Sequence, residues 1–380
     1  MMIRYVSMPS PRRFGPLVFL TLLIALLAPG CSRIRNPEGW ADPSISADGA
    51  YVFQSKDRLS YITPPTDSAA VRWTFPDKNQ KSTDLKLRAV YGEPLIEDGV
   101  VYFASYEGDV FALKASDGSQ IWRRGIDGGV TGRLVSTKQA LVFGSIEGRV
   151  WSIDKLNGAN SVGWPKSGVK LPDPIWAGVA VQGDTAYAAT MGGDVFALAL
   201  SDGRPVWNKP FHVSGAVGDL ALVAPNRLFV PSLNKSVYVV DTSTGQAIAP
   251  GAQATDWVWM QPAMKGSIAY YADFSGSVFS LDITSGVATS IGSVGAKVKS
   301  SPVLVGDVLV LAARDRNVTF FDIKEGKKLN TVLAGESGTF RAGLTASNDL
   351  VYGITTKGSL FRANPKELSV VEIPIVGGSK

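Results

Sequence analysis

Two residue types that could carry chemistry occur only once each in this chain of 380 residues. Cys31 follows a twelve-residue apolar run from Leu17 to Ala28, and His212 stands in the middle of the chain. A single cysteine and a single histidine exclude an internal disulfide and any zinc site that needs several such ligands. No serine or aspartate is placed to form an evident catalytic pair with His212. A structural or surface role for this imidazole is therefore favoured over general-base catalysis.

The position of Cys31 indicates an export signal. Three arginines precede the apolar run, whose length is typical of a signal-peptide core and too short to span a bilayer comfortably. Residues 27–31 resemble a bacterial lipobox, with Ala28 where the motif usually has leucine. We therefore expect residues 1–30 to be a lipoprotein signal peptide, residues 31–40 a tether, and Cys31 the lipidated residue. A conventional signal peptide with an incidental cysteine is the alternative.

Most of the chain repeats one unit of four short strands. In residues 94–122, turns at Asp98-Gly99, Glu107-Gly108 and Asp117-Gly118 separate runs rich in β-branched and aromatic residues, and the last run ends in Trp122. This spacing of turn formers is typical of an antiparallel meander. The first apolar residue of the third strand recurs at intervals of about 40 to 51 residues, as Leu59, Val110, Val150, Val195, Val237, Val278, Val318 and Leu360.

Sheets of this kind bury both faces only when they stack around an axis. The sequence therefore predicts an all-β fold, a single eight-bladed β-propeller of four-stranded antiparallel blades over residues 41–380. The polar stretch 77–86 is expected to be a solvated loop. Residues 369–376 are expected to be the fourth strand of the last blade, with no evident exchange of strands where the ring closes.

The repeat resembles a known family. Residues 108–122 and 193–207 follow the pattern Gly-x-Val-aromatic-Ala-Leu-x-x-x-Asp/Thr-Gly-x-x-x-Trp, and residues 276–286 follow it more weakly. This pattern is similar to the PQQ-like β-propeller repeats, which are named after quinoprotein dehydrogenases. With the lipobox and the chain length, the whole resembles the BamB-type assembly lipoproteins. The resemblance implies a membrane-anchored propeller with a protein partner in the cell envelope.

The family name also raises the possibility of a quinoprotein enzyme or a small-ligand sensor, which is our alternative hypothesis. Quinoproteins of this fold use a vicinal cysteine pair, a catalytic aspartate and a Ca²⁺ ion, which takes six to eight oxygen ligands. The vicinal cysteines are absent, and no cluster of acids stands beside an asparagine in a loop between blades. We therefore expect no cofactor, no metal and no enzymatic activity.

Two recurring residue types have structural explanations. Trp73, Trp122, Trp164 and Trp207 recur in blades 1–4 and are expected to pack between blades rather than line a cofactor site. Asp154, Asp241, Asp282 and Asp322 follow the third strand in register, and are expected to accept hydrogen bonds from nearby backbone N–H groups.

Charge excludes one class of partner. The formal net charge is +5, and it falls to about +2 without residues 1–30, which contain three arginines and no acid. A mature chain with so small an excess of basic residues lacks the electrostatic footprint of a nucleic-acid-binding protein. We expect a monomeric propeller.

A binding surface is expected on the loops that connect the outer strand of one blade to the inner strand of the next, because all of these loops open on the same face. Aromatic residues, methionine and arginine are enriched at protein interfaces. The candidate partner-binding residues are Ile175, Trp176, Asp219, Trp257, Trp259, Phe340 and Arg341. Asp219 is included because the resemblance to BamB-type proteins implies that acidic residues near an entry loop in the middle of the ring engage a partner, and Asp219 lies in a roughly corresponding blade. As an alternative, Trp257 and Trp259 could begin the inner strand of blade 6 and pack on its sheet.

The sequence thus predicts a non-enzymatic scaffold outside the cytoplasm. It would be anchored by lipid to the cell membrane or outer membrane and would bind a protein partner through its propeller loops. Assembly of outer-membrane proteins is the specific role that the resemblance implies.

Overall fold

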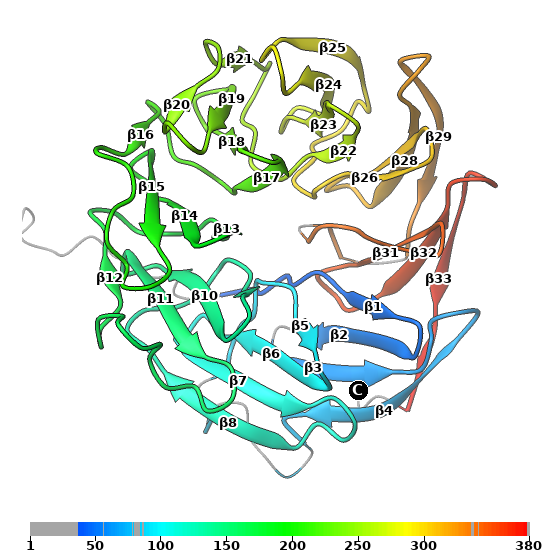
Figure 1. The fold of residues 1–380 in the computed structure, drawn as a ribbon. Coiled ribbons are helices and arrows are strands. Elements are labelled where there is room, and N and C mark those ends of the chain that lie inside the picture. Colours follow the sequence, from blue (N-terminus) through cyan, green and yellow to red (C-terminus); the bar gives the residue numbers. More distant parts are fainter. Residues whose placement is uncertain are drawn as a thin grey trace, which may run out of the picture. The chain divides into compact units, whose positions relative to one another are not determined.

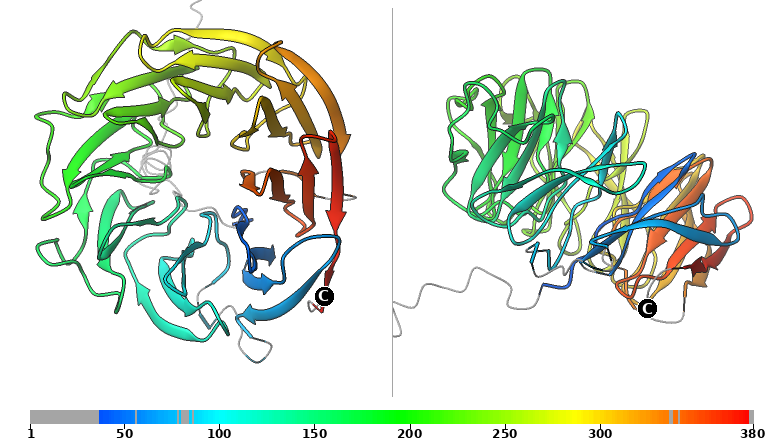
Figure 2. Two further views of the ribbon diagram at one scale, coloured as in Figure 1. Left: turned by 45° about the vertical axis from the view of Figure 1, so that its right-hand side comes forward. Right: turned by 90° about the horizontal axis from the view of Figure 1, so that it is seen from below.

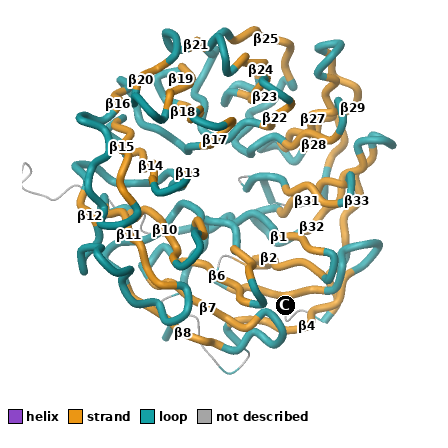
Figure 3. Tube along the Cα trace, viewed as in Figure 1, coloured by secondary structure: helices purple, strands orange, loops and turns teal. Residues whose placement is uncertain are grey.

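The computed structural model describes residues 37–377, except residues 56, 78, 80–83, 86, 336, 337 and 341. The residues from Glu38 onward belong to one unit. The described chain consists of strands joined by loops (Figure 3), and none of it forms a helix with the length and apolarity needed to cross a bilayer. Cys31, Arg341 and much of the polar stretch 77–86 lie outside the described residues.

Eight separate sheets surround a central axis, which confirms the predicted eight-bladed propeller (Figures 1 and 2). The innermost strands are β1 (Ser44–Ser46), β5 (Leu95–Glu97), β9 (Val135–Ser136), β13 (Ala180–Gln182), β17 (Ala221–Ala224), β22 (Ala263–Lys265), β26 (Val303–Val305) and β30 (Thr345–Ser347). The second strands are β2 (Gly49–Ser55), β6 (Val100–Ala104), β10 (Ala140–Ser145), β14 (Thr185–Ala189), β18 (Arg227–Pro231), β23 (Ile268–Ala272), β27 (Val308–Ala312) and β31 (Leu350–Ile354).

The third strands are β3 (Arg58–Ile62), β7 (Asp109–Lys114), β11 (Arg149–Asp154), β15 (Asp194–Ala199), β19 (Ser236–Asp241), β24 (Ser277–Asp282), β28 (Asn317–Asp322) and β32 (Leu360–Asn364). The outer strands are β4 (Ala69–Phe75), β8 (Gln120–Gly125), β12 (Val169–Lys170), β16 (Phe211–His212), β20 (Gln246–Ala247), β25 (Ala288–Ser293), β29 (Lys327–Leu333) and β33 (Ser369–Ile373). Two further strands, β21 (Ala252–Gln253) and β34 (Ile375–Val376), add to blades 5 and 1.

The register predicted for the third strand is confirmed. All eight predicted apolar positions, from Leu59 to Leu360, lie in third strands and are at most 1 % exposed. The turn predicted at Asp98-Gly99 has positive φ at both residues, 49° and 74°. This is the left-handed backbone that asparagine, aspartate and glycine adopt in tight hairpins.

The recurring tryptophans join neighbouring blades, as predicted. Each indole N–H donates to a backbone carbonyl of the next blade, as Trp73 to Ala115 (2.9 Å), Trp122 to Lys155 (3.0 Å), Trp164 to Leu200 (2.6 Å) and Trp207 to Thr242 (2.9 Å). The ring of Trp207 also covers Gly245, where a Cβ atom would lie 2.7 Å from the indole. The glycine and the tryptophan of adjacent blades are thus parts of the same contact.

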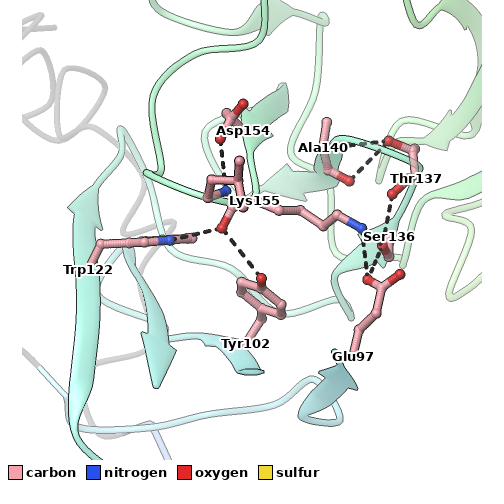
Figure 4. A network of polar contacts seen from close by, with 9 residues as sticks. Glu97, Tyr102, Trp122, Ser136, Thr137, Ala140, Asp154 and Lys155 are labelled. Carbon is pink, nitrogen blue, oxygen red and sulfur yellow. Dashed lines mark hydrogen bonds and ion pairs between the residues drawn. The ribbon is translucent and has the colours of Figure 1, made fainter. Parts of the chain in front are cut away.

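Figure 4 shows one such contact between blades 2 and 3. The Lys155 carbonyl accepts hydrogen bonds from Trp122 Nε1 and, at 3.4 Å, from the Tyr102 hydroxyl. The Lys155 ammonium donates to Glu97 Oε2 and to Ser136 Oγ, each at 3.0 Å. One residue of blade 3 is therefore held at its backbone and at its side chain, which fixes the angle between the two blades.

The predicted turn acids also behave as expected. The carboxylates accept backbone N–H bonds two residues ahead, from Leu156 to Asp154, Ser243 to Asp241, Thr284 to Asp282 and Lys324 to Asp322, at 2.8 to 2.9 Å. Hydrogen bonds to the charged form lower the pKa of Asp241, Asp282 and Asp322. These aspartates stabilise turns.

The ring closes differently from the prediction. The outer strand of blade 8 ends at Ile373, and Ile375 and Val376 pair in parallel with Ala69 and Ala70 of β4. A second contact joins the inner edges, where Thr345 Oγ1 donates to the Pro43 carbonyl at 2.7 Å. The sequence pattern could not separate the two strands, because residues 369–376 read as one β-rich run.

Candidate functional site

The links between successive blades share one face of the propeller. In a four-stranded meander, the loop between the second and third strands and the link to the next blade leave from the same end of the sheet. We call this end the loop face. It contains the links between successive blades, so a site built there can draw residues from the whole ring.

A cavity of about 100 Å³ lies on the loop face, and the segments that precede the innermost strands of seven blades form its wall. We call it the channel mouth. Two positions supply its polar and aromatic side chains. Asp42, Glu93, Arg133 and Asp219 each lie two residues before an innermost strand, and Trp40, Tyr91, Trp176 and Trp259 each lie four residues before one.

Within the part of the chain that the structure describes, one of the three carboxylates has a cation as its direct partner. Arg133 Nη1 lies 3.7 Å from Asp219 Oδ2, while Nη2 donates to the Leu220 carbonyl at 3.0 Å. Asp42 accepts the N–H of Gly343. Glu93 accepts no hydrogen bond from the described part of the chain. Two acids at the channel mouth therefore have no ion-pair partner among the described residues.

Burial changes the ionisation of these acids. It raises the pKa of Asp42 to about 6, opposed by the Gly343 N–H and by Arg133. Burial and the neighbouring Asp42 raise the pKa of Glu93 to about 7. Both effects favour the neutral acid, because the charged form loses water and meets another negative group.

An unbroken row of ring and cation contacts crosses the channel mouth. Trp40 meets Tyr91 edge to face, with ring centres 4.4 Å apart. The Lys299 ammonium lies 4.8 Å from the Trp40 ring and 4.7 Å from the Trp259 ring, within the range of cation–π attraction. Burial lowers the pKa of Lys299. The aromatic faces of the channel mouth thus already hold one cation from the chain itself.

A second aromatic surface lies on the same face, between blades 5 and 6. Trp257 is 46 % exposed and stacks on Phe274, with ring centres 5.5 Å apart. The fully buried Asp273 carboxylate fixes both segments, because it accepts the N–H groups of Asp256 (2.8 Å) and Ser277 (3.1 Å). The exposed indole is therefore held rigidly before any partner binds.

The structure divides the predicted partner-binding residues into three groups. Trp176, Asp219 and Trp259 line the channel mouth, and Trp257 lies exposed beside it. Ile175 and Phe340 are 0 % and 1 % exposed, and we correct their assignment, because core side chains cannot contact a partner. Arg341 lies outside the described residues.

Trp257 and Trp259 precede β22, which begins at Ala263. The two tryptophans do not begin the inner strand of blade 6. The alternative prediction, that they start this strand and pack on its sheet, is therefore wrong.

Residues that the sequence reasoning missed complete the channel mouth. They are Trp40, Asp42, Tyr91, Glu93, Arg133 and Lys299. The sequence contains a signal for these residues. Each of them lies two or four residues before an innermost strand, the same spacing as the predicted residues Trp176, Asp219 and Trp259.

Acid–base catalysis by His212 and metal binding find little support among the described residues. His212 is 64 % exposed at its side chain and pairs with Asp194 at 2.8 Å, where Asp194 and His212 are opposite each other on β15 and β16. The described residues contain no group of three or more His, Cys, Asp or Glu side chains that could hold a metal.

Comparison with known proteins identifies the family. The family model described as "Outer membrane protein assembly factor BamB" matches residues 39–164 and 161–371. The chain belongs to this family. A BamB from Xanthomonas campestris is 24 % identical over 67 % of the chain and 74 % of its own length, and one from Yersinia pestis is 24 % identical over 75 % and 72 %. A BamB from Alkalilimnicola ehrlichii is 26 % identical, but the match covers only 45 % of this chain and 41 % of the relative.

Solved structures agree on the fold. BamB from Moraxella catarrhalis superposes with a TM-score of 0.66 at 15 % identity, covering 89 % of this chain and 95 % of that one. The designed Ika8 protein superposes with a TM-score of 0.70 at 16 % identity, covering 86 % and 96 %. A quinoprotein ethanol dehydrogenase from Pseudomonas putida is also similar, at 24 % identity over 67 % of this chain and 37 % of its own length.

Proposed function

We propose that this chain is a non-catalytic scaffold outside the cytoplasm, anchored by lipid at Cys31, that binds a protein partner through the loop face during outer-membrane protein assembly. Membership of the BamB family supports the assembly role. The observation that carries the binding role is the exposed, rigidly held Trp257 beside the channel mouth. Large aromatic side chains that are fixed before binding are typical of interface hot spots.

The contact should depend on Trp257 and Trp176. Replacing either with alanine should reduce the recovery of co-purified assembly proteins from solubilised membranes by about tenfold, the effect of a hot spot worth about 1.4 kcal/mol. The partners are identified by mass spectrometry, and circular dichroism checks that the strand signal is unchanged.

Leu156→Ala is the matched control, because Leu156 is 84 % exposed on the turn after β11, at the opposite face. Its variant should retain the partner. Equal recovery in all three variants would remove the loop face as the binding surface.

The similarity to a quinoprotein dehydrogenase keeps a second hypothesis open, namely that the channel binds a quinone cofactor. We expect PQQ with Ca²⁺ to leave the melting temperature unchanged, because the described residues offer no cluster of acidic ligands for the metal. A ligand at 100 times its Kd would stabilise the protein by about 2.7 kcal/mol, which thermal melting detects easily. A PQQ-dependent rise, together with dye-linked dehydrogenase activity, would establish the enzyme hypothesis instead.

A further inference from the structure

The described residues supply few positive charges to the carboxylates of the channel mouth. Arg133 makes its ion pair with Asp219, and the same Asp219 accepts backbone N–H bonds from Leu220 (2.7 Å) and Gly178 (3.2 Å). Asp42 has only the Gly343 N–H, and the Glu93 carboxylate has no hydrogen bond within the described residues. Buried acids without a paired cation are costly in the charged form. A second cation entering the cavity could therefore form ion pairs with the Asp42 and Glu93 carboxylates.

The wall of the channel mouth suits a cation in a further respect. Trp40 and Trp259 already enclose the Lys299 ammonium, so their faces have the geometry for cation–π contact. Tyr91 and Trp176 belong to the same wall. Tyr91 is 6 % exposed, and its hydroxyl approaches the backbone of Gly39 but completes no hydrogen bond with any described residue. The wall therefore offers aromatic faces to a cation.

Glycines keep the acids accessible. A Cβ atom on Gly343 would lie 2.6 Å from Asp42 Oδ2, and one on Gly178 would lie 3.1 Å from Asp219 Oδ1. A cavity of about 100 Å³ can hold the head of one side chain but no folded segment.

We propose that the channel mouth receives a single cationic side chain, arginine or lysine, from the protein partner, held between the Asp42 and Glu93 carboxylates and the aromatic wall. This inference rests on the proposed function and specifies the chemistry of the partner. The loop-face tryptophan Trp257 would supply apolar contact beside the cavity, and the charged pocket would select the basic residue.

The first experiment titrates Nα-acetyl-arginine amide into the full-length protein in detergent and follows tryptophan fluorescence, since three tryptophans line the cavity. The uncharged isostere Nα-acetyl-citrulline amide should bind at least about tenfold more weakly, as should the arginine probe to Glu93→Gln. Binding should weaken from pH 8 to pH 5, because protonation removes the charge of both acids, whose pKa values are about 6 and 7. Equal binding of the two probes, or unchanged binding to the variant, would overturn the proposal.

Two controls keep the result interpretable. Glu325→Gln removes an exposed acid whose partner is Lys327 at 4.0 Å, and it should bind like the wild type. Glu93→Gln should be at least as stable as the wild type at pH 8. The raised pKa of Glu93 means that the folded state holds a proton between about pH 4.5 and 7, so stability falls as pH rises through this range. The glutamine variant avoids that loss.

The second experiment separates this proposal from the proposed function. Glu93→Gln should lower partner recovery about tenfold, while Glu325→Gln should not change it. If the arginine probe binds the wild type but Glu93→Gln retains the partner, the cavity serves free small cations, and the assignment to a partner side chain is wrong. If the wild type recovers no partner while the probes still discriminate, the scaffold hypothesis fails and the cation site alone stands.

Discussion

Replacing Cys31 with alanine should move nearly all of the protein from the membrane fraction to the soluble extracytoplasmic fraction. Cys31 is the only cysteine in the chain and follows an apolar run of signal-peptide length. The diacylglycerol and amide-linked acyl chains of a lipoprotein each contribute about 0.8 kcal/mol per buried CH₂ group, so their loss removes the anchor as a whole. Fractionation followed by immunoblotting measures the shift.

Ser32→Ala leaves the cysteine in place and is the matched control, which should stay with the membrane. The circular dichroism spectrum of Cys31→Ala should match that of the wild type, because the described blades do not include residue 31. A Cys31→Ala protein that sediments with membranes as completely as the wild type would show that the chain is held there by something other than lipid.

Replacing Trp207 with alanine should have the largest effect on stability, a loss of about 3–5 kcal/mol in the free energy of unfolding. The indole is 7 % exposed, donates to the Thr242 carbonyl of the next blade and covers Gly245. The alanine variant removes the hydrogen bond and leaves a cavity between blades 4 and 5. Urea unfolding followed by circular dichroism measures the change.

Two variants separate packing from the hydrogen bond. Trp207→Phe should cost about 1–2 kcal/mol, because most of the ring contact remains while the N–H donor is lost. Trp257→Ala should change stability by less than about 1 kcal/mol, since that indole is half exposed and lies outside the interblade cores. If the alanine variants at 207 and 257 unfolded alike, the interblade contact would not be what holds these blades together.

The fold was predictable because the sequence features that indicate it recur once in each blade. A third strand needs one buried apolar residue at a fixed place in each blade, and this requirement appears eight times. Tight turns need residues that tolerate positive φ, and these recur in most blades. Val110, Val195 and Val278 are equivalent for this reason, and each is fully buried. The tryptophan contacts followed from the same register.

The channel mouth was less predictable because its residues carry no periodic hydrophobicity. Residue type predicts Trp176 and Trp259, and the family resemblance suggests Asp219, whereas neither points to Asp42 or Glu93. Their significance depends on the closed ring, which brings segments from residue 40 to residue 343 to the same axis and buries the charges of Asp42 and Glu93. Ile175 and Phe340 were misjudged because an apolar residue in a loop can turn into the core as readily as out to solvent.

The pairing of β34 with β4 also bears on aggregation of the newly synthesised chain. Synthesis delivers Ala69 and Ala70 early, but their partners Ile375 and Val376 arrive about 300 residues later. Until then, the rim of the first blade is an unpaired strand, which is a template for joining other chains. Pairings this distant in the chain also form slowly. We therefore expect the outer edge of blade 1 to be open to pairing with other chains until those two residues dock and cover part of it.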